Sequence, residues 1–262
     1  MQDIRFEILP TALLDEYLLQ VDKTVFENFS NLKDSELSAD AFNFYTSVSA
    51  VFSSKIEGED IELDSYIKHK KWGVKFLPDH TRKIDDLYEA YQFAKENPLN
   101  ESNIKQVHIL LTKHILQKAQ RGKLRTGNMF VTTQDGKIEY VACQPAEVKK
   151  EINKLYNDIA LLINAELSFE ETLFFAALIH LVFVKIHPFD DGNGRTARLL
   201  EKWFLAQKTD TKAWFVQSEK HYYSHHQTYY QNIRKLRIEY ELLDYSQAMQ
   251  FLQMLPQSLT SA

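Results

Sequence analysis

The feature that most constrains this chain is the stretch 173–186, which is apolar on almost every side. A helix with apolar residues all round its circumference is stable only when other elements cover it, so it belongs in the middle of a core. The stretch is too short to cross a membrane, which takes about 20 consecutive apolar residues. We therefore expect a central helix over 173–186 with other helices packed around it.

A glycine-containing loop follows this stretch directly. It reads His187-Pro188-Phe189-Asp190-Asp191-Gly192-Asn193-Gly194-Arg195-Thr196-Ala197-Arg198. Because proline disfavours helical geometry in the residue before it, the chain should turn at His187. Apolar residues then return at helical spacing, so a second helix should begin near Asn193 or Gly194.

The residue types in this loop are those of an anion-binding site. Glycines allow backbone dihedrals that turn successive N–H groups toward one ligand, and a helix N-terminus adds partial positive charge. Arg195 and Arg198 add full charges on neighbouring parts of one helix face. A carboxylate beside such a site fits a divalent cation that bridges it to phosphates. A plain turn between packed helices would explain the glycines, but not a histidine, a carboxylate and two arginines in one loop.

These residues resemble the signature of the Fic family, H-P-F-x-[D/E]-G-N-G-R-x-x-R, and match it at every specified position. The resemblance implies transfer of AMP from ATP to a hydroxyl group of a target protein. It implies that His187 deprotonates this hydroxyl and that Asp191 holds Mg²⁺ against the α- and β-phosphates. The phosphates would be cradled by Gly192, Asn193 and Gly194, with Arg195 at the β-phosphate and Arg198 at the γ-phosphate.

A helix nearer the N-terminus is predicted by apolar residues at helical spacing over 44–56. Ser38 or Asp40 could cap its start, and Gly58 could follow its end. Ser53 and Glu57 lie four residues apart, and therefore on one face of this helix. For most such pairs, a solvated face is the simplest interpretation.

The segment 53–58 also resembles the inhibitory motif of Fic proteins, [S/T]-x-x-x-E-[G/N]. The resemblance implies that Glu57 pairs with Arg198 and blocks productive binding of the γ-phosphate, while Ser53 supports the inhibitory helix. A carboxylate near Arg198 would occupy the place of a phosphate oxygen and repel that phosphate. Small misplacement of ATP then suffices to slow an in-line transfer.

Two β-prone segments around Asp135-Gly136 predict a hairpin over about 127–142. An isolated hairpin is only marginally stable, so it needs a partner. The resemblance implies a flap over the active site that pairs with an extended segment of the target; a plain surface hairpin is the alternative. The target-docking residues expected at its tip are Thr132, Thr133, Gln134, Asp135, Gly136 and Lys137.

Near the C-terminus, Tyr229 and Tyr230 resemble a Tyr-Tyr pair that follows the signature in many Fic proteins and helps form the adenine pocket. Arg237 stands where family members often have asparagine, so the chain departs from the family pattern of base recognition there. The stretch 242–255 predicts one closing helix.

Together these features predict a mainly α fold, a Fic-type helical bundle with a small β-hairpin flap over the active site. The expected regions are an N-terminal helical region at 1–82, with the inhibitory helix at about 40–58, a catalytic core at 83–208, and C-terminal helices at 209–262 that complete the nucleotide pocket. The hairpin and the signature loop, 187–198, belong to the core. Only 7 glycines and 6 prolines agree with few turns.

The composition of the chain limits the kinds of partner it can bind and the cellular compartment in which we expect it. A net charge of −5 speaks against a general nucleic-acid binder. Cys143 is the only cysteine, which excludes an internal disulfide, and the N-terminus has no apolar signal segment, so we expect a cytoplasmic protein. The expected partners are a target protein on the flap, the chain itself as a substrate of automodification, and a second copy in a homodimer, but neither nucleic acid nor membrane.

The expected function is that of a protein adenylyltransferase that uses ATP and Mg²⁺, modifies a Ser, Thr or Tyr hydroxyl, and is autoinhibited by Glu57 pairing with Arg198. Two alternatives keep the same site. One is removal of AMP from targets, with Glu57 helping to activate water, and the other is ATP sensing without turnover. Phosphotransfer is less expected, because the family branch that performs it has lysine where this chain has Gly194.

Overall fold

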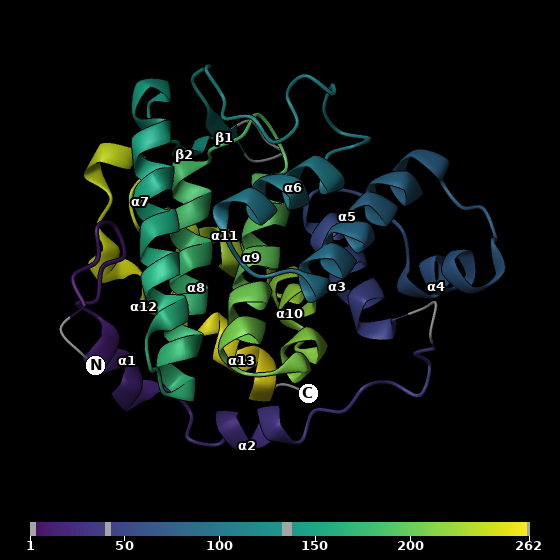
Figure 1. Ribbon diagram of the computed structural model, residues 1–262, viewed down its shortest axis with the longest axis horizontal. Helices are drawn as coiled ribbons and strands as arrows, with labels where there is room; N and C mark the ends of the chain where they lie inside the picture. The colour runs from purple at the N-terminus through teal and green to yellow at the C-terminus, as the bar shows by residue number, and fades with distance from the viewer. Residues whose placement is uncertain (1–3, 40–42, 133–137, 261–262) are drawn as a thin grey trace.

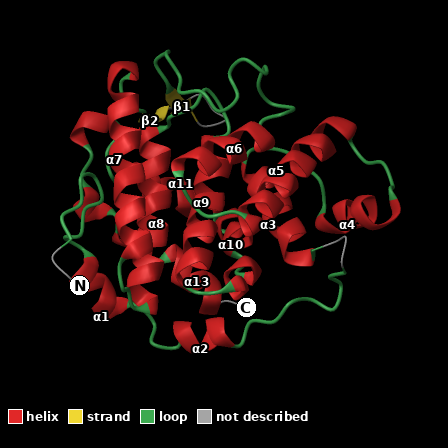
Figure 2. Ribbon diagram, in the orientation of Figure 1, coloured by secondary structure: helices red, strands yellow, loops and turns green. Residues whose placement is uncertain are grey.

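The computed structural model describes residues 4–39, 43–132 and 138–260. These residues form mainly helices with one small antiparallel sheet, as Figure 2 shows, so the predicted mainly α fold with a hairpin is confirmed. Of the described helices, none is long and apolar enough to cross a membrane. The division of the chain at residues 82 and 208 stays a prediction.

The elements before the hairpin are α1 (Leu14–Gln20), α2 (Val25–Ser30), α3 (Phe44–Ile56), α4 (Leu63–Trp72), α5 (Pro78–Glu96) and α6 (Glu101–Leu111). After the hairpin come α7 (Pro145–Asn164), α8 (Phe169–Ile186), α9 (Asn193–Lys208), α10 (Ser218–Ser224), α11 (His226–Arg234), α12 (Met249–Leu252) and α13 (Met254–Thr260). Short 3₁₀ turns lie at η1 (Thr211–Phe215), η2 (Tyr240–Leu242) and η3 (Tyr245–Gln247).

Helix α8 is the centre of the fold, as its apolar sequence predicts. It is buried without interruption from Thr172 to Ile186, and α7 and α9 flank it while α1, α2, α12 and α13 also contact it (Figure 1). Its start is fixed by a capping box, in which Ser168 and Glu171 each accept a hydrogen bond from the backbone N–H of the other. Because α8 is buried along its length, the core fixes the position of its C-terminal end, where the signature loop begins.

Helix α3 begins later than expected. Its cap is Asn43, whose side chain accepts a hydrogen bond from the backbone N–H of Thr46 at 2.8 Å. The expectation of a cap at Ser38 was wrong in position, although the Ser38 hydroxyl accepts the N–H of Phe44 at 3.1 Å; Asp40 lies outside the described residues. Gly58 follows the helix end with a φ of +92°, as expected for a glycine in that place.

A buried polar network holds α3 against its neighbours. The Lys202 ammonium of α9 donates to Ser49 of α3 at 2.6 Å and to the carboxylate of Glu219 in α10 at 2.5 Å. Tyr91 of α5 donates to the same carboxylate at 2.6 Å. Because Lys202 and Glu219 are buried, each needs the other's charge, and the network ties four helices together. The middle of α3 is thereby fixed against α9, and the contact of Ser53 with Arg198, one turn further along α3, brings the end of α3 toward the start of α9.

The predicted hairpin consists of β1 (Phe130–Thr132) and β2 (Ile138–Val141), which pair antiparallel with an irregularity after Val131. It lies at the end of the bundle where α8 ends (Figure 1). Strand β2 is not isolated, because the N–H of Val141 donates to the carbonyl of Ile238 at 2.8 Å. Of the expected docking tip, Thr132 to Lys137, Thr132 is the exposed last residue of β1, and residues 133–137 lie outside the described residues.

The expected single helix over 242–255 was wrong. This stretch instead contains the turn η3 and the short helix α12. The carboxylate of Asp244 accepts the backbone N–H and the hydroxyl of Ser246, which offers the backbone an alternative to continuous helix.

Candidate active site

His187 stands at the end of α8 in a left-handed conformation, with a φ of +52°. This is the turn that Pro188 predicts. Its backbone is held by Arg125, a buried residue that the sequence analysis did not single out. The Nε of Arg125 donates to the His187 carbonyl at 2.6 Å, and its backbone N–H donates to the Pro188 carbonyl at 3.0 Å. The buried guanidinium, whose Nη2 also donates to the Ile186 carbonyl at 3.3 Å, thus satisfies carbonyls that have no helical partner where α8 ends.

The imidazole of His187 is kept neutral. Burial lowers the pKa of His187 to about 4, and the charge of Arg125 adds to this effect. The carbonyl of Val184 and the carboxylate of Glu57 oppose it only in part. A neutral imidazole has one nitrogen with a free lone pair, which is what a general base needs.

The loop between α8 and α9 is held in shape by Asn193. Its side chain accepts the N–H of Phe189 at 2.9 Å and donates to the Phe189 carbonyl at 2.8 Å. Gly192 has a φ of +78°, and a Cβ there would lie 2.8 Å from a methyl carbon of Thr112. Both polar atoms of the Asn193 side chain contact the backbone of Phe189, so they are not free to bind an anion. An anion at this loop would instead be bound by backbone N–H groups at the start of α9.

Arg198 is buried and is paired with Glu57. Its Nη2 donates to Glu57 Oε1 at 2.6 Å, and its Nε donates to the Ser53 hydroxyl at 2.8 Å. All three residues belong to motifs in the sequence, and the structure brings them into contact. Burial acts to raise the pKa of Glu57, but the charges of Arg198 and Arg195 outweigh it and hold the pKa below the usual value. Glu57 is therefore an anion in the resting protein.

The carboxylate of Glu57 also lies directly over the start of α9. A Cβ built on Gly194 would lie 2.5 Å from Glu57 Oε1, so only glycine leaves room for the carboxylate here. Glu57 thus occupies the place beside a helix N-terminus that an anionic ligand would take.

Arg195 is paired with a second carboxylate that the sequence analysis missed. Its Nη2 donates to Glu59 Oε2 at 2.5 Å, and both side chains are buried. The other oxygen of Glu59 accepts a hydrogen bond from Lys83 at 3.1 Å. The sequence contains a signal for this second ion pair. Glu59 lies two residues after Glu57, and Arg195 lies three residues before Arg198, so each residue is close to a member of the expected pair.

Tyr229 is buried and takes part in a polar chain inside the core. Its hydroxyl lies 2.9 Å from His180 Nε2 and 3.5 Å from Nη1 of Arg198. His180 Nδ1 lies 2.8 Å from the carboxylate of Glu201. Since a carboxylate only accepts, His180 donates through Nδ1 and accepts the Tyr229 proton, and the Tyr229 oxygen then faces Arg198. Tyr230, the other expected adenine contact, is only partly buried.

Asp191, the expected metal ligand, is exposed. Its Oδ1 accepts the N–H of Gly192 at 2.5 Å, and its backbone carbonyl accepts a hydrogen bond from His108 Nε2 at 2.9 Å. Burial lowers the pKa of His108 to about 4, so this contact is made by a neutral ring. Within the described ranges, no three His, Cys, Asp or Glu side chains form a group that could hold a metal ion.

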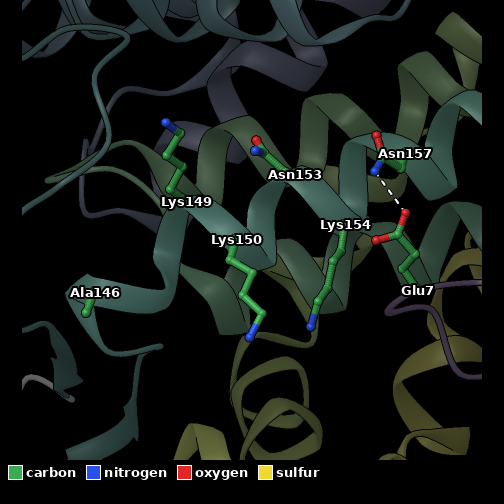
Figure 3. Close-up of a pocket in the computed structure, with 7 residues that line it drawn as sticks. All are labelled: Glu7, Ala146, Lys149, Lys150, Asn153, Lys154 and Asn157. Atoms are coloured by element: carbon green, nitrogen blue, oxygen red, sulfur yellow. Dashed lines mark hydrogen bonds between the residues drawn. The ribbon is translucent and has the colours of Figure 1, made fainter.

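A surface hollow elsewhere in the molecule has different chemistry. Figure 3 shows its lining residues, Glu7, Ala146, Lys149, Lys150, Asn153, Lys154 and Asn157. Lys150 and Lys154 form ion pairs with Glu147 and Glu151 along α7. None of these lining residues belongs to the signature loop, 187–198. The hollow is therefore separate from the candidate active site.

The fold and the loop define a class of helical protein in which a central helix ends in a histidine, the next helix begins with two arginines, and a hairpin lies alongside. Residues 98–205 match the sequence model of the Fic/DOC family. A curated relative, the protein adenylyltransferase Fic of Nematostella vectensis, is 34% identical over 158 residues, which cover 56% of this chain and 34% of the relative. The chain thus spans about a third of that relative's length.

Solved structures agree on the fold. A Fic family protein from Desulfovibrio desulfuricans G20 superposes with a TM-score of 0.76 at 17% identity, covering 99% of this chain and 75% of that protein. A Fic domain containing signaling protein from Bacteroides thetaiotaomicron gives a TM-score of 0.65 at 17% identity, covering 95% and 92%. Residues 98–205 thus match a Fic domain, and the chain as a whole has the fold of these Fic proteins.

Proposed function

We propose that this chain is a protein adenylyltransferase that moves AMP from ATP to a Ser, Thr or Tyr hydroxyl of a target protein. The observation that carries the proposal is the position of His187 at the end of α8, one short loop before Arg195 and Arg198 in the first two turns of α9. The carboxylate of Glu57 interacts electrostatically with all three side chains. The name of the Nematostella relative, protein adenylyltransferase, supports the same reaction.

In this reaction, His187 takes the proton from the target hydroxyl through Nε2. The hydroxyl oxygen forms a bond to the α-phosphorus of ATP, the bond from that phosphorus to the oxygen bridging to the β-phosphorus breaks, and pyrophosphate leaves. Backbone N–H groups at Asn193 and Gly194, with Arg195 and Arg198, bind the phosphates and stabilise the charge that develops on them, while Gly192 shapes the turn. The adenine would lie near Tyr230, since Tyr229 is enclosed in the core.

The residues present fit a magnesium ion. Mg²⁺ is commonly held by one or two carboxylates together with phosphate oxygens and waters. Asp191 is an exposed carboxylate beside the proposed phosphate site, and one of its oxygens fixes the turn at Gly192. Bound there with ATP, Mg²⁺ would neutralise charge on the α- and β-phosphates.

The resting protein is held back by its own carboxylates. The Nη2 of Arg198 donates to Glu57 and is then not available to a γ-phosphate. In the same way, the Nη2 of Arg195 donates to Glu59. Two negative charges also repel an incoming triphosphate. Since the network around Lys202 and Glu219 fixes α3, release need only move residues 57–59, which lie just beyond its end.

The target segment would dock on the hairpin, whose tip we expect at Thr132 to Lys137, by adding a strand to its edge. Strand β2 is already bonded to Ile238 at Val141, so strand addition there is blocked and the edge of β1 is the better docking edge. The chain itself, in the same molecule or in a second copy, is a further substrate for automodification.

The test compares the intact protein with Glu57→Gly and with Glu57→Gly/His187→Ala, each incubated with Mg²⁺ and ATP labelled at the α- or the γ-phosphate. Protein-bound label from the α-phosphate alone, strong in Glu57→Gly and lost in the double variant, supports AMP transfer and its internal brake. Label from the γ-phosphate would mean phosphotransfer. With no label in any variant, release of AMP from an adenylylated protein is measured, and nucleotide binding alone would favour ATP sensing.

A further inference from the structure

The side chain of Tyr140 reaches from strand β2 to the imidazole of His187. Its hydroxyl lies 3.0 Å from His187 Nδ1, and the two rings meet edge-on with centroids 5.9 Å apart. Tyr140 is 3% exposed, so this contact is shielded from water. Tyr140 lies within the predicted hairpin, 127–142, but the sequence gives it no role in the site.

The direction of the hydrogen bond follows from a second contact of the same nitrogen. The carbonyl oxygen of Val184 lies 3.3 Å from His187 Nδ1, and a carbonyl can only accept. Nδ1 therefore carries the proton and donates a hydrogen bond to both oxygens. The hydroxyl oxygen of Tyr140 is the closer acceptor. In a neutral imidazole the lone pair is then on Nε2.

Tyr140 is held firmly in this position by its neighbours. On one side, Glu139 forms an ion pair with Arg234, and on the other, the N–H of Val141 donates to the Ile238 carbonyl at 2.8 Å. The ammonium of Lys185 lies 4.7 Å from the centre of the Tyr140 ring. A side chain fixed in this way can orient its partner at little entropic cost.

We propose that Tyr140 is a positioning residue, whose hydroxyl fixes His187 in the tautomer and ring orientation that leave Nε2 free to take the target's proton. This inference rests on the proposed function and adds a residue to it. It also gives the hairpin a second role, since the element expected to dock the target also orients the base.

The first test reads the tautomer directly and needs no enzymatic activity. ¹⁵N-histidine NMR is recorded for the nucleotide-free full chain, for Tyr140→Phe and for Tyr156→Phe, and the His187 signals are assigned by their loss in His187→Ala. Tyr156 is a matched control, because it is also a buried tyrosine and its hydroxyl has no partner among the described residues.

The expected result is a protonated Nδ1 and a bare Nε2 in the intact chain and in Tyr156→Phe, with the other tautomer gaining population in Tyr140→Phe. A proton on Nε2 in the intact chain, or tautomer populations unchanged by Tyr140→Phe, would overturn the proposal. Both outcomes can be read even if the protein transfers no AMP, which separates this inference from the proposed function.

The second test is kinetic and uses the Glu57→Gly background. Loss of one hydrogen bond to the base should lower kcat by roughly three- to tenfold in Tyr140→Phe and leave the KM for ATP unchanged. Tyr156→Phe should leave both unchanged. An unchanged kcat in Tyr140→Phe, or a fall matched by Tyr156→Phe, would assign the Tyr140 hydroxyl a structural role only.

Discussion

The guanidinium of Arg195 and the carboxylate of Glu59 form a buried ion pair with 2.5 Å between Nη2 and Oε2. The Nε of the same arginine has no hydrogen-bond partner among the described residues. A buried arginine with an unused donor is incompletely satisfied. Arg195 therefore has both a carboxylate that can be exchanged for a phosphate and a donor left over for a second oxygen.

Glu59→Gln should make the resting protein less stable and more responsive to nucleotide. Removing the charge of one partner in a buried ion pair costs up to about 3–5 kcal/mol, because the other charge is left uncompensated. ATP with Mg²⁺ should restore more stability in the variant than in the intact chain, since its phosphates replace the lost carboxylate. Thermal unfolding with and without MgATP measures both effects.

Glu62→Gln is the matched control for this change. Glu62 lies on the same segment and pairs with Lys55, but its side chain is 76% exposed, so its loss should have little effect. If Glu59→Gln unfolds at the same temperature as Glu62→Gln and gains no more from MgATP, then Glu59 does not compete for the phosphate site.

Glu57→Gly should raise the rate of AMP transfer. A hydrogen bond to a charged group contributes about 1.5–3 kcal/mol, so freeing Arg198 from Glu57 should raise the competent fraction by roughly ten- to a hundredfold. Ser53 still holds the Nε of Arg198 at 2.8 Å, so the arginine should stay in place. Initial rates with labelled ATP and an accepted target measure the gain, and equal rates in both proteins would rule out the inhibitory role.

Much of this site could be predicted from the sequence because its residues are close together in the chain. Residues 187–198 fix their own loop geometry, as the contacts of Asn193 with Phe189 show. The pairing of Glu57 with Arg198 joins residues far apart in the chain, and it could be predicted only because both sit in motifs.

Contacts outside those motifs could not be predicted. Arg125, Glu59 and Tyr140 reach residues of the signature from three separate parts of the chain, and only tertiary packing brings them there. The assignment of Tyr229 to an adenine pocket stays a prediction. The contact of its hydroxyl with His180 lies outside the motifs and could not be predicted.

Asp191→Asn should remove the effect of Mg²⁺ on nucleotide binding without disturbing the loop. The amide oxygen of asparagine can still accept the N–H of Gly192, but the negative charge that favours a magnesium ion is lost. Calorimetry with ATP, with and without Mg²⁺, should show a magnesium-dependent gain in affinity for the intact chain but not for Asp191→Asn. Asp190→Asn is the control, since Asp190 contacts Gln120 at 3.2 Å and has no expected part in binding; an equal loss in both variants would contradict the assignment.

The rate of AMP transfer in Glu57→Gly should stay high well below neutral pH. Burial lowers the pKa of His187 to about 4, while Glu57 acts to raise it, so removing Glu57 cannot move the pKa upward. The neighbouring charge of Arg125 acts in the same direction as burial, and Tyr140 remains neutral because burial raises its pKa. A base that is neutral above about pH 4 loses activity only as the pH falls through that value.

The same depressed pKa sets the sign of a stability change. In the unfolded chain, His187 takes up a proton near its ordinary pKa of about 6.5. Below that pH the unfolded state binds more protons than the folded state, so the contribution of His187 to stability is complete above about pH 6.5 and declines toward pH 4. Rates at saturating MgATP between pH 4 and 8, with unfolding midpoints of the intact chain and His187→Ala, test both statements. If the rate instead falls on the acidic side with a midpoint near pH 6.5, the imidazole is solvated in the working enzyme. That result would contradict a pKa of His187 lowered by burial.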